Sequence, residues 1–267
     1  MTQTEEKHIW LRKRFSRTVR YVVYVVRANW PLSSLVSLRN CKRGRRVFLL
    51  GSGPSLAKMD LKLLAGEDVC VVNMGVRALD AGLPNVEIHI ATDKNRYVRF
   101  ADDMERYATV HRIPLRFFGI WVKKLWYQRR SEASTPRFLV VGRKSFLQRG
   151  FKTTPLLGYG SSGTVLIFAL QVLYYLGYRE VYVAGVDLDY TQEQPYFYSL
   201  QDADKVHELD AKVQARRPLM DNANVEFEIA RKTFEADDRK LVNIGIGGNL
   251  VVLPRSTLEA VIAQQKL

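Results

Sequence analysis

The stretch from Val47 to Leu56, VFLLGSGPSL, constrains the fold of this chain more than any other. Its four apolar residues predict a buried strand that ends at Gly51, and Gly-Ser-Gly-Pro-Ser then turns the chain into a helix. A glycine turn at a helix N-terminus presents unpaired backbone N–H groups and the positive end of the helix dipole, so it can hold a phosphate. The same residues fit a plain strand-to-helix turn capped by Ser55. They complete neither a Rossmann fingerprint nor a Walker loop.

Two more apolar runs follow, Asp68 to Asn73 (DVCVVN) and Glu87 to Thr92 (EIHIAT), and helical segments at 56–64 and 75–81 precede them. This alternation predicts an α/β fold with a doubly wound, mostly parallel, Rossmann-like sheet. Ligands of such sheets bind beyond the carboxyl ends of the strands, where Ser52, Asn73 and Asp93 lie. Singly, each is a common turn or capping residue. Together they predict a ligand-binding edge, with Asn73 facing a ribose or base and Asp93 facing hydroxyls or a metal.

A second informative block runs from Gly158 to Tyr190. Gly-Ser-Ser-Gly at 160–163 precedes the apolar run 164–176, which predicts a buried helix with a capped N-terminus and a second anion site. The strand predicted at 180–184 ends before Asp187. The tyrosines of the polar loop that follows could hydrogen-bond a phosphate or simply pack: Tyr190, Tyr196 and Tyr198.

The segment from Ile113 to Arg137 mixes aromatic and basic residues without a clean period. It fits an interfacial contact, a lid-like insertion over an anionic substrate, or a loop folded onto the core by its aromatic side chains. Further segments read as helices at 94–107, 204–214, 224–236 and 256–265, and as strands at 138–141 and 241–244.

Positive charge is concentrated at the N-terminus. Residues 1–46 carry twelve Lys or Arg against Glu5 and Glu6, a net charge of +10, which leaves +4 of the chain's +14 for the other 221 residues. Apolar residues recur among these cations at helical spacing and predict an amphipathic arm lying on an anionic membrane surface, with a single domain at 47–267. A basic helix packed on the domain fits as well. No run is long enough to span a bilayer, and no signal peptide is recognisable.

Cysteine and histidine usage points to a reducing cytoplasm and to no metal or cofactor. Cys41 and Cys70 have no metal-ligand spacing, and Cys70 lies in an apolar run typical of a buried thiol. The four histidines show no zinc spacing. His207, on a polar helix after the tyrosine loop, is the one placed to act as a base, although a solvated surface position fits it too.

Both blocks resemble bacterial glycosyltransferases that use CMP-activated ulosonic acids. The lipooligosaccharide sialyltransferases carry a nearly identical opening turn, a second strand ending in Asn, and a Gly-x-Asp like Gly185 to Asp187. The transferases that add Kdo to the lipopolysaccharide core are more similar over 158–188, where the spacing matches without gaps. The resemblance covers Val47 to about Tyr198 in pieces.

This resemblance implies a transferase with CMP in the strand-end crevice, no metal, and a lipid-linked oligosaccharide acceptor at the cytoplasmic face of the inner membrane. By position, the donor nucleotide would contact Ser52, Gly53, Asn73, Asp93, Ser161, Ser162, Gly163 and Thr164. Tyr190 and Tyr196 or Tyr198 would stabilise the departing phosphate. Pro218 falls near the position of the sialyltransferases' histidine base, which leaves Asp187, Asp189 or His207 as the base.

Two other functions fit parts of the sequence. A pterin-type pyrophosphokinase shares the Gly-x-Gly-Pro-Ser opening, but it would need paired aspartates for magnesium where only Asp93 is evident. A non-catalytic nucleic-acid binder would use residues 1–46 and bind in a strongly salt-dependent way. We expect nucleic acid not to be the partner, because the apolar residues of the arm favour a membrane surface.

Overall fold

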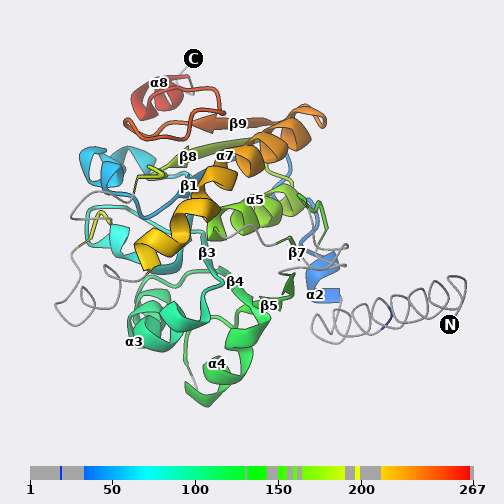
Figure 1. The fold of residues 1–267 in the computed structure, drawn as a ribbon. Helices are drawn as coiled ribbons and strands as arrows, with labels where there is room; N and C mark the ends of the chain where they lie inside the picture. The colour runs from blue at the N-terminus through cyan, green and yellow to red at the C-terminus, as the bar shows by residue number, and fades with distance from the viewer. Residues whose placement is uncertain are drawn as a thin grey trace, which may run out of the picture.

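The strand predicted at 47–50 lies inside a seven-stranded sheet, whose order is β5-β4-β3-β2-β1-β8-β9 (Figure 1). Every pairing in this sheet is parallel. The computed structural model describes residues 19, 33–129, 131–142, 150–154, 159–160, 164–189, 196–198 and 212–264. The strands are β1 (Arg46–Leu50), β2 (Asp68–Val72), β3 (Ile88–Ala91), β4 (Leu115–Gly119), β5 (Arg137–Leu139), β8 (Glu180–Ala184) and β9 (Lys240–Asn243). A separate parallel pair joins β6 (Val141–Gly142) to β7 (Tyr159–Gly160).

The inner strands are buried on both faces, as their continuous apolar sequences predict. All five residues of β2 are buried, and successive residues of β1 point into different clusters, Leu49 into one and Phe48 into the other. The predicted doubly wound, mostly parallel α/β fold is therefore confirmed.

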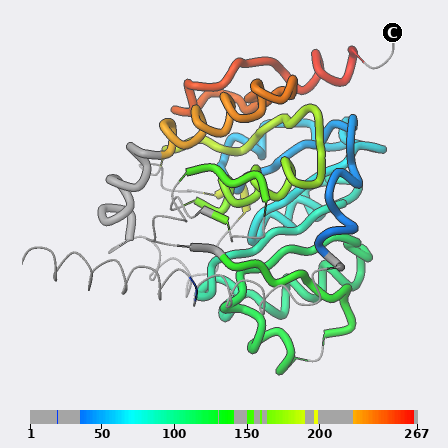
Figure 2. The backbone as a smooth tube through the Cα atoms, turned by 90° about the vertical axis from the view of Figure 1, so that its right-hand side faces the viewer, coloured from blue at the N-terminus to red at the C-terminus, as the bar shows by residue number. Residues whose placement is uncertain are grey.

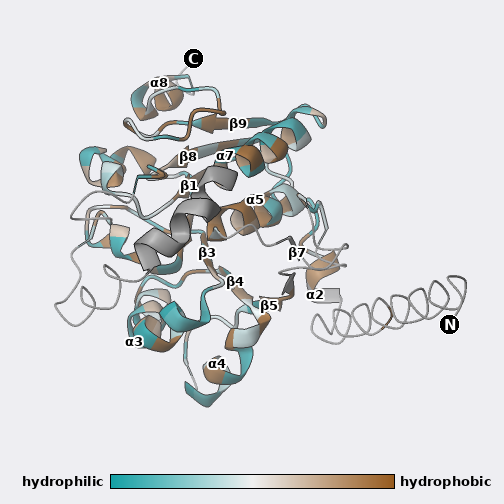
Figure 3. Cartoon of the chain, in the orientation of Figure 1, coloured by the Kyte–Doolittle hydropathy of each residue, from teal (hydrophilic) through white to brown (hydrophobic). Residues whose placement is uncertain are grey.

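Two long helices cover one face of the sheet: α5 (Val165–Leu176) and α7 (Lys212–Glu235) (Figure 1). They pack in the cluster that contains Leu49, Cys70 and Ile90. Every residue from Leu166 to Leu176 is buried, and Figure 3 shows hydrophobic, brown turns in α5. A helix that is apolar on all sides has to lie inside the protein, so the prediction of a buried helix here is confirmed.

The other face is covered by α3 (Lys94–Val110), α8 (Leu258–Ala263) and three 3-10 helices: η1 (Pro54–Lys58), η2 (Leu61–Leu64) and η3 (Asn73–Leu79). The helices expected at 56–64 and 75–81 are thus 3-10 helices. Figure 2 shows the molecule from the side, with β9 and α8 at one end and the green segment that holds α4 (Lys123–Arg129) at the other.

The segment 113–137, expected as a lid-like insertion or a loop, is part of the sheet. It holds β4, η4 (Ile120–Val122), α4 and the first residue of β5. Phe117, Phe118 and Trp126 are buried, and the Arg116 side chain is fully enclosed. No period is visible in the sequence because three short elements follow one another and the strand is buried on both faces.

The last part of the predicted arm belongs to the domain. Leu35, in α2 (Ser33–Val36), is buried. Lys42 pairs with Glu87 at 2.5 Å, Arg45 with Asp68 at 2.7 Å, and Arg46, the first residue of β1, with Glu67 at 2.5 Å. Three cations assigned to a membrane surface are therefore held by the domain's own carboxylates. Residues 1–32, except for Val19, lie outside the described residues.

No helix within the described ranges is long and apolar enough to cross a membrane.

Candidate functional site

The sheet changes direction between β1 and β8. From β1 the chain adds β2, β3, β4 and β5 on one side, whereas β8 and β9 lie on the other side. At such a switch point the connections leave the two strands in opposite directions and open a crevice at their carboxyl ends. The segments that border this crevice are 51–55, after β1, and 185–189, after β8.

These two segments touch through their backbones. The Gly51 N–H donates to the Ala184 carbonyl and the Gly53 N–H to the Gly185 carbonyl, both at 2.8 Å. A Cβ atom at Gly51 would lie 2.2 Å from the Gly185 oxygen, and one at Gly53 would lie 2.5 Å from the Asp187 Oδ2. The two glycines are thus required by a close backbone approach, not by backbone conformation.

Asp187 occupies the N-terminus of η1. Its Oδ2 accepts the Ser55 backbone N–H at 2.9 Å and its Oδ1 accepts the Ser55 hydroxyl. The expectation that this turn offers unpaired N–H groups is therefore wrong for Gly51, Gly53 and Ser55, whose donors are all used. A carboxylate of the protein itself stands where a phosphate was expected.

The backbone around Asp187 has residues with left-handed φ values and packs closely against Gly248. Gly185 and Leu188 have left-handed φ values of 65° and 49°, and a Cβ at Gly248 would lie 2.9 Å from the Asp187 Cα. The Asn249 N–H donates to the Asp187 carbonyl at 2.8 Å. Asp187 is 8% exposed, whereas Asp189 is half-buried. Of the three predicted bases, Asp187 accepts two hydrogen bonds from Ser55, Asp189 follows it in the same segment, and His207 lies outside the described residues.

Asn73 follows β2 at the same edge and has a left-handed φ of 47°. Its carbonyl oxygen lies 2.9 Å from the Nε2 of His89. Its side-chain Oδ1 is buried and has no hydrogen-bond partner among the described residues. A buried acceptor without a donor is costly, so this oxygen stands out among the polar atoms at the edge of the sheet.

The segment 196–198 lies against the glycine turn, because the Phe197 N–H donates to the Ser52 carbonyl at 3.1 Å. The rings of Tyr196 and Tyr198 stack with centroids 5.2 Å apart, and each residue is 8% exposed. The Tyr196 hydroxyl accepts a hydrogen bond from Arg96. Both tyrosines therefore pack in the core cluster beside α3, and Tyr190 lies outside the described residues.

Asp93 caps α3. Its Oδ1 accepts the N–H groups of Asn95 at 2.9 Å and of Arg96 at 3.2 Å. Asp93 therefore has the capping function that the sequence analysis considered. The Oδ2 of Asp93 lies 3.9 Å from the Arg96 Nε. Arg96 joins Asp93 to Tyr196. No sequence pattern indicates this link, because Asp93 and Tyr196 are 103 positions apart in the chain.

Thr164 caps α5 by accepting the Leu166 N–H at 3.3 Å. The chain runs from α5 directly into β8, so α5 is antiparallel to the strands and its N-terminus lies at their carboxyl edge. The fully buried Gln171 accepts the Lys152 N–H and donates to the Ile167 carbonyl. Its side chain therefore has a structural function in the core. Ser161, Ser162 and Gly163 lie outside the described residues.

A polar cavity of about 410 Å³ lies beside the tyrosine segment. Its walls are Arg77, Asp80, Ala81, Asp103, Arg106, Tyr107, Phe197 and Tyr198. Asp103 pairs with Arg77 at 2.7 Å and with Arg106 at 3.5 Å, and Asp80 accepts the Tyr107 hydroxyl. The two cations and two carboxylates leave the wall with no net charge. This cavity could not be predicted from the sequence, because its residues come from three separate segments.

Groups of three or more His, Cys, Asp or Glu that could hold a metal ion do not occur within the described part of the chain.

No protein-family model matches this sequence, and no curated protein matches it either. Two solved structures are similar at 15% identity. The MAf glycosyltransferase from Magnetospirillum magneticum AMB-1 aligns over 85% of this chain and 38% of its own length, with a TM-score of 0.47. The sialyltransferase CstII from Campylobacter jejuni, solved with the substrate analogue cytidine-5'-monophosphate, aligns over 79% and 87%, with a TM-score of 0.35. This chain thus spans about two fifths of the first protein, and neither likeness is strong enough to assign an activity.

Proposed function

We propose that this protein is a glycosyltransferase that moves an ulosonic acid, Kdo or sialic acid, from its CMP-activated donor to a lipopolysaccharide or lipooligosaccharide core acceptor. The observation that carries the proposal is the crevice between β1 and β8, where the two motifs that resemble such transferases are joined by the Ser55–Asp187 hydrogen bonds. A mononucleotide fits this position in a doubly wound sheet.

The nucleoside would contact Ser52, Gly53 and Asn73. Asn73 supports this assignment because its Oδ1 is a buried acceptor without a partner among the described residues. The phosphate would lie at the N-terminus of α5 rather than at η1, where the Asp187 carboxylate would repel it. The twelve-residue α5 begins at the Thr164 cap, and its dipole would stabilise the charge that develops on CMP.

In the transfer step the bond between the anomeric carbon and the phosphate oxygen breaks, and CMP leaves with the electron pair. The acceptor hydroxyl oxygen forms the new bond, and its proton passes to a base. We propose that the base is one of the three candidates that the sequence offers, Asp187, Asp189 or His207. No metal is needed if helix N–H groups stabilise the leaving phosphate.

We place the acceptor in the polar cavity between η3 and α3. Its segment 196–198 also contacts the Ser52 turn, so the cavity and the nucleotide crevice share a wall. Because its Arg and Asp side chains neutralise one another, the cavity suits an uncharged sugar with many hydroxyls better than a phosphate. The basic residues 1–32 would hold the enzyme at the anionic cytoplasmic face of the inner membrane, at about 1 kcal/mol per cation.

Thermal unfolding of the full chain with CMP, CMP-Kdo and CMP-sialic acid tests the donor class. A donor present at a hundredfold over its dissociation constant adds about 2.7 kcal/mol to the free energy of unfolding. Ser52→Ala should weaken this response, and Ser37→Ala, an exposed position before the sheet, should leave it unchanged. If none of the three cytidine compounds raises the thermal stability, and ATP and a pterin do, the proposal is contradicted.

Liposome flotation tests the membrane assignment. Removal of residues 1–32 should abolish binding to anionic vesicles and leave CMP binding intact. Salt-sensitive binding of RNA or DNA that disappears with the same deletion would instead identify a nucleic-acid binder.

A further inference from the structure

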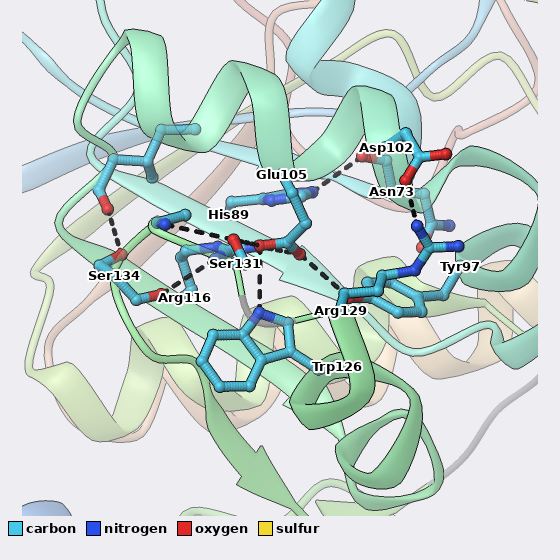
Figure 4. A network of polar contacts seen from close by, with 12 residues as sticks. Asn73, His89, Tyr97, Asp102, Glu105, Arg116, Trp126, Arg129, Ser131 and Ser134 are labelled. Carbon is cyan, nitrogen blue, oxygen red and sulfur yellow. Dashed lines mark hydrogen bonds and ion pairs between the residues drawn. The ribbon is translucent and has the colours of Figure 1, made fainter.

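His89 is a fully buried histidine on β3, where its neighbours across the sheet are Val71 of β2 and Arg116 of β4. Its Nε2 lies 2.9 Å from the carbonyl oxygen of Asn73, and Figure 4 shows this contact beside the network around Glu105 and Arg116. A carbonyl oxygen can only accept a hydrogen bond. The Nε2 must therefore carry the proton, which fixes one tautomer of the imidazole.

The surroundings of His89 keep it uncharged. The pKa of His89 is lowered to about 3, first by burial and then by the nearby Arg116 guanidinium, and the Asn73 carbonyl and Glu105 offset only part of this effect. Arg116 donates to Glu105 at 2.6 Å and to the Ser134 carbonyl at 2.9 Å, so its charge is held in place. His89 is thus a permanent hydrogen-bond donor and not a proton carrier.

The His89 N–H donates to Asn73, a residue with an unfavourable backbone conformation. Asn73 has a φ of 47°, a conformation that Asn tolerates better than other L-residues but that still has to be stabilised by its surroundings. The hydrogen bond from His89 fixes the carbonyl of this residue, and with it the direction in which the side chain leaves the backbone. The Oδ1 of that side chain is the buried acceptor with no partner among the described residues.

We infer that His89 is a positioning residue, which holds the Asn73 peptide so that the Asn73 Oδ1 accepts a hydrogen bond from an N–H or O–H group of the bound nucleotide. This inference rests on the proposed function, since the ligand is the CMP moiety assigned to the crevice. His89 itself does not touch the ligand.

Calorimetric titration of CMP into the full chain tests this role with matched variants. Asn73→Ala should weaken CMP binding about tenfold or more, and His89→Phe, which fills the space without a donor, about tenfold. His89→Gln places its amide N–H near the position of Nε2 and should restore most of the affinity. His89→Asn is too short to reach the carbonyl and should not. The double variant Asn73→Ala/His89→Phe should bind no more weakly than Asn73→Ala, because both act through one contact.

Long-range proton–nitrogen NMR of the wild-type protein gives a readout that does not depend on any variant folding. A protonated Nε2 and a bare Nδ1 are expected, with no titration between pH 5 and 8. A protonated Nδ1, or CMP affinity that is equal in the wild type and His89→Phe, would overturn the inference and leave the proposed function standing. A wild-type chain that binds no cytidine compound overturns the proposed function and the inference together.

Discussion

Ser55 and Asp187 are 132 positions apart in the chain and are joined by two buried hydrogen bonds, from the Ser55 N–H and from its hydroxyl to the two carboxylate oxygens. The pair ties the first helical turn after β1 to the loop after β8. It therefore fixes both walls of the crevice at the switch point of the sheet.

Removal of this pair should destabilise the protein in a graded way. Ser55→Ala loses one hydrogen bond to a charged group, about 2 kcal/mol, and Asp187→Ala leaves both Ser55 donors buried and unpaired, about 3 kcal/mol. Asp187→Asn should cost least, because an amide can accept from the N–H and donate to the hydroxyl. Urea unfolding measures these changes, with Asp60→Ala, an exposed cap, as the control. If Asp187→Asn instead abolished transfer at unchanged stability, Asp187 would be the base.

Gly51→Ala should cost about 3 kcal/mol or prevent folding, because the added methyl group would lie 2.2 Å from the Gly185 oxygen and push two central strands apart. Gly66→Ala is the matched control. Its methyl group meets nothing within 4 Å, and only the left-handed φ of 81° is unfavourable, at about 1 kcal/mol. Equal thermal stability of the two variants would contradict the contact between the strand ends.

Removal of the cation from the buried Arg116–Glu105 pair should lower the free energy of unfolding far more than removal of the cation from a surface pair. Burial alone would raise the pKa of Glu105, but hydrogen bonds from Arg116, Ser131 and Trp126 outweigh it and the pKa is lowered. Arg116→Met therefore leaves a buried carboxylate without its cation, at about 3–5 kcal/mol. Lys232→Ala, which breaks an exposed pair with Glu228, should cost less than about 0.5 kcal/mol. Urea unfolding of both variants makes the comparison.

His89 should make stability depend on pH above the range where carboxylates titrate. Its pKa is about 3 in the folded protein against 6.5 as reference, so the unfolded chain binds a proton that the folded chain does not. Stability is then complete above pH 6.5 and falls as the pH drops. The wild type should lose about 2 kcal/mol between pH 7 and pH 5. His89→Phe should show a flat profile in this window, and a parallel decline in both proteins would argue against a buried neutral histidine.

Ala81→Trp should separate the two halves of the proposed reaction. Ala81 is exposed at the wall of the polar cavity, so an indole there fills the cavity without disturbing the core. Transfer to the acceptor should fall at least tenfold, while CMP affinity and the acceptor-independent hydrolysis of the donor stay unchanged. Ala65→Trp, at an exposed turn elsewhere, is the control. Unchanged transfer in Ala81→Trp would remove the acceptor from this cavity.

The strands that form the sheet were predictable because each is a short, continuous apolar run bounded by turn residues, as in 47–50, 68–72 and 180–184. A strand that is buried on both faces is apolar along its whole length, so it can be recognised as a continuous apolar run. The buried helix 165–176 and the position of Cys70 in the core were predictable for the same reason. Segment 115–119 was missed because Arg116 interrupts its apolar run, and the pairing with Glu105 that allows this cation to be buried is not visible in the sequence.

Within the candidate site, the sequence by itself determined which polar residues stand at strand ends: Ser52, Asn73, Asp93 and Asp187. Only the tertiary structure decided what they do there. In the structure Asp187 accepts the hydrogen bonds at the N-terminus of η1, and Asp93 caps α3. The Asn73 amide oxygen has no hydrogen-bond partner among the described residues. Burial and the local cap at Asp93 follow from nearby residues, whereas the partner of Ser55 lies 132 positions away, and no local pattern encodes that pairing.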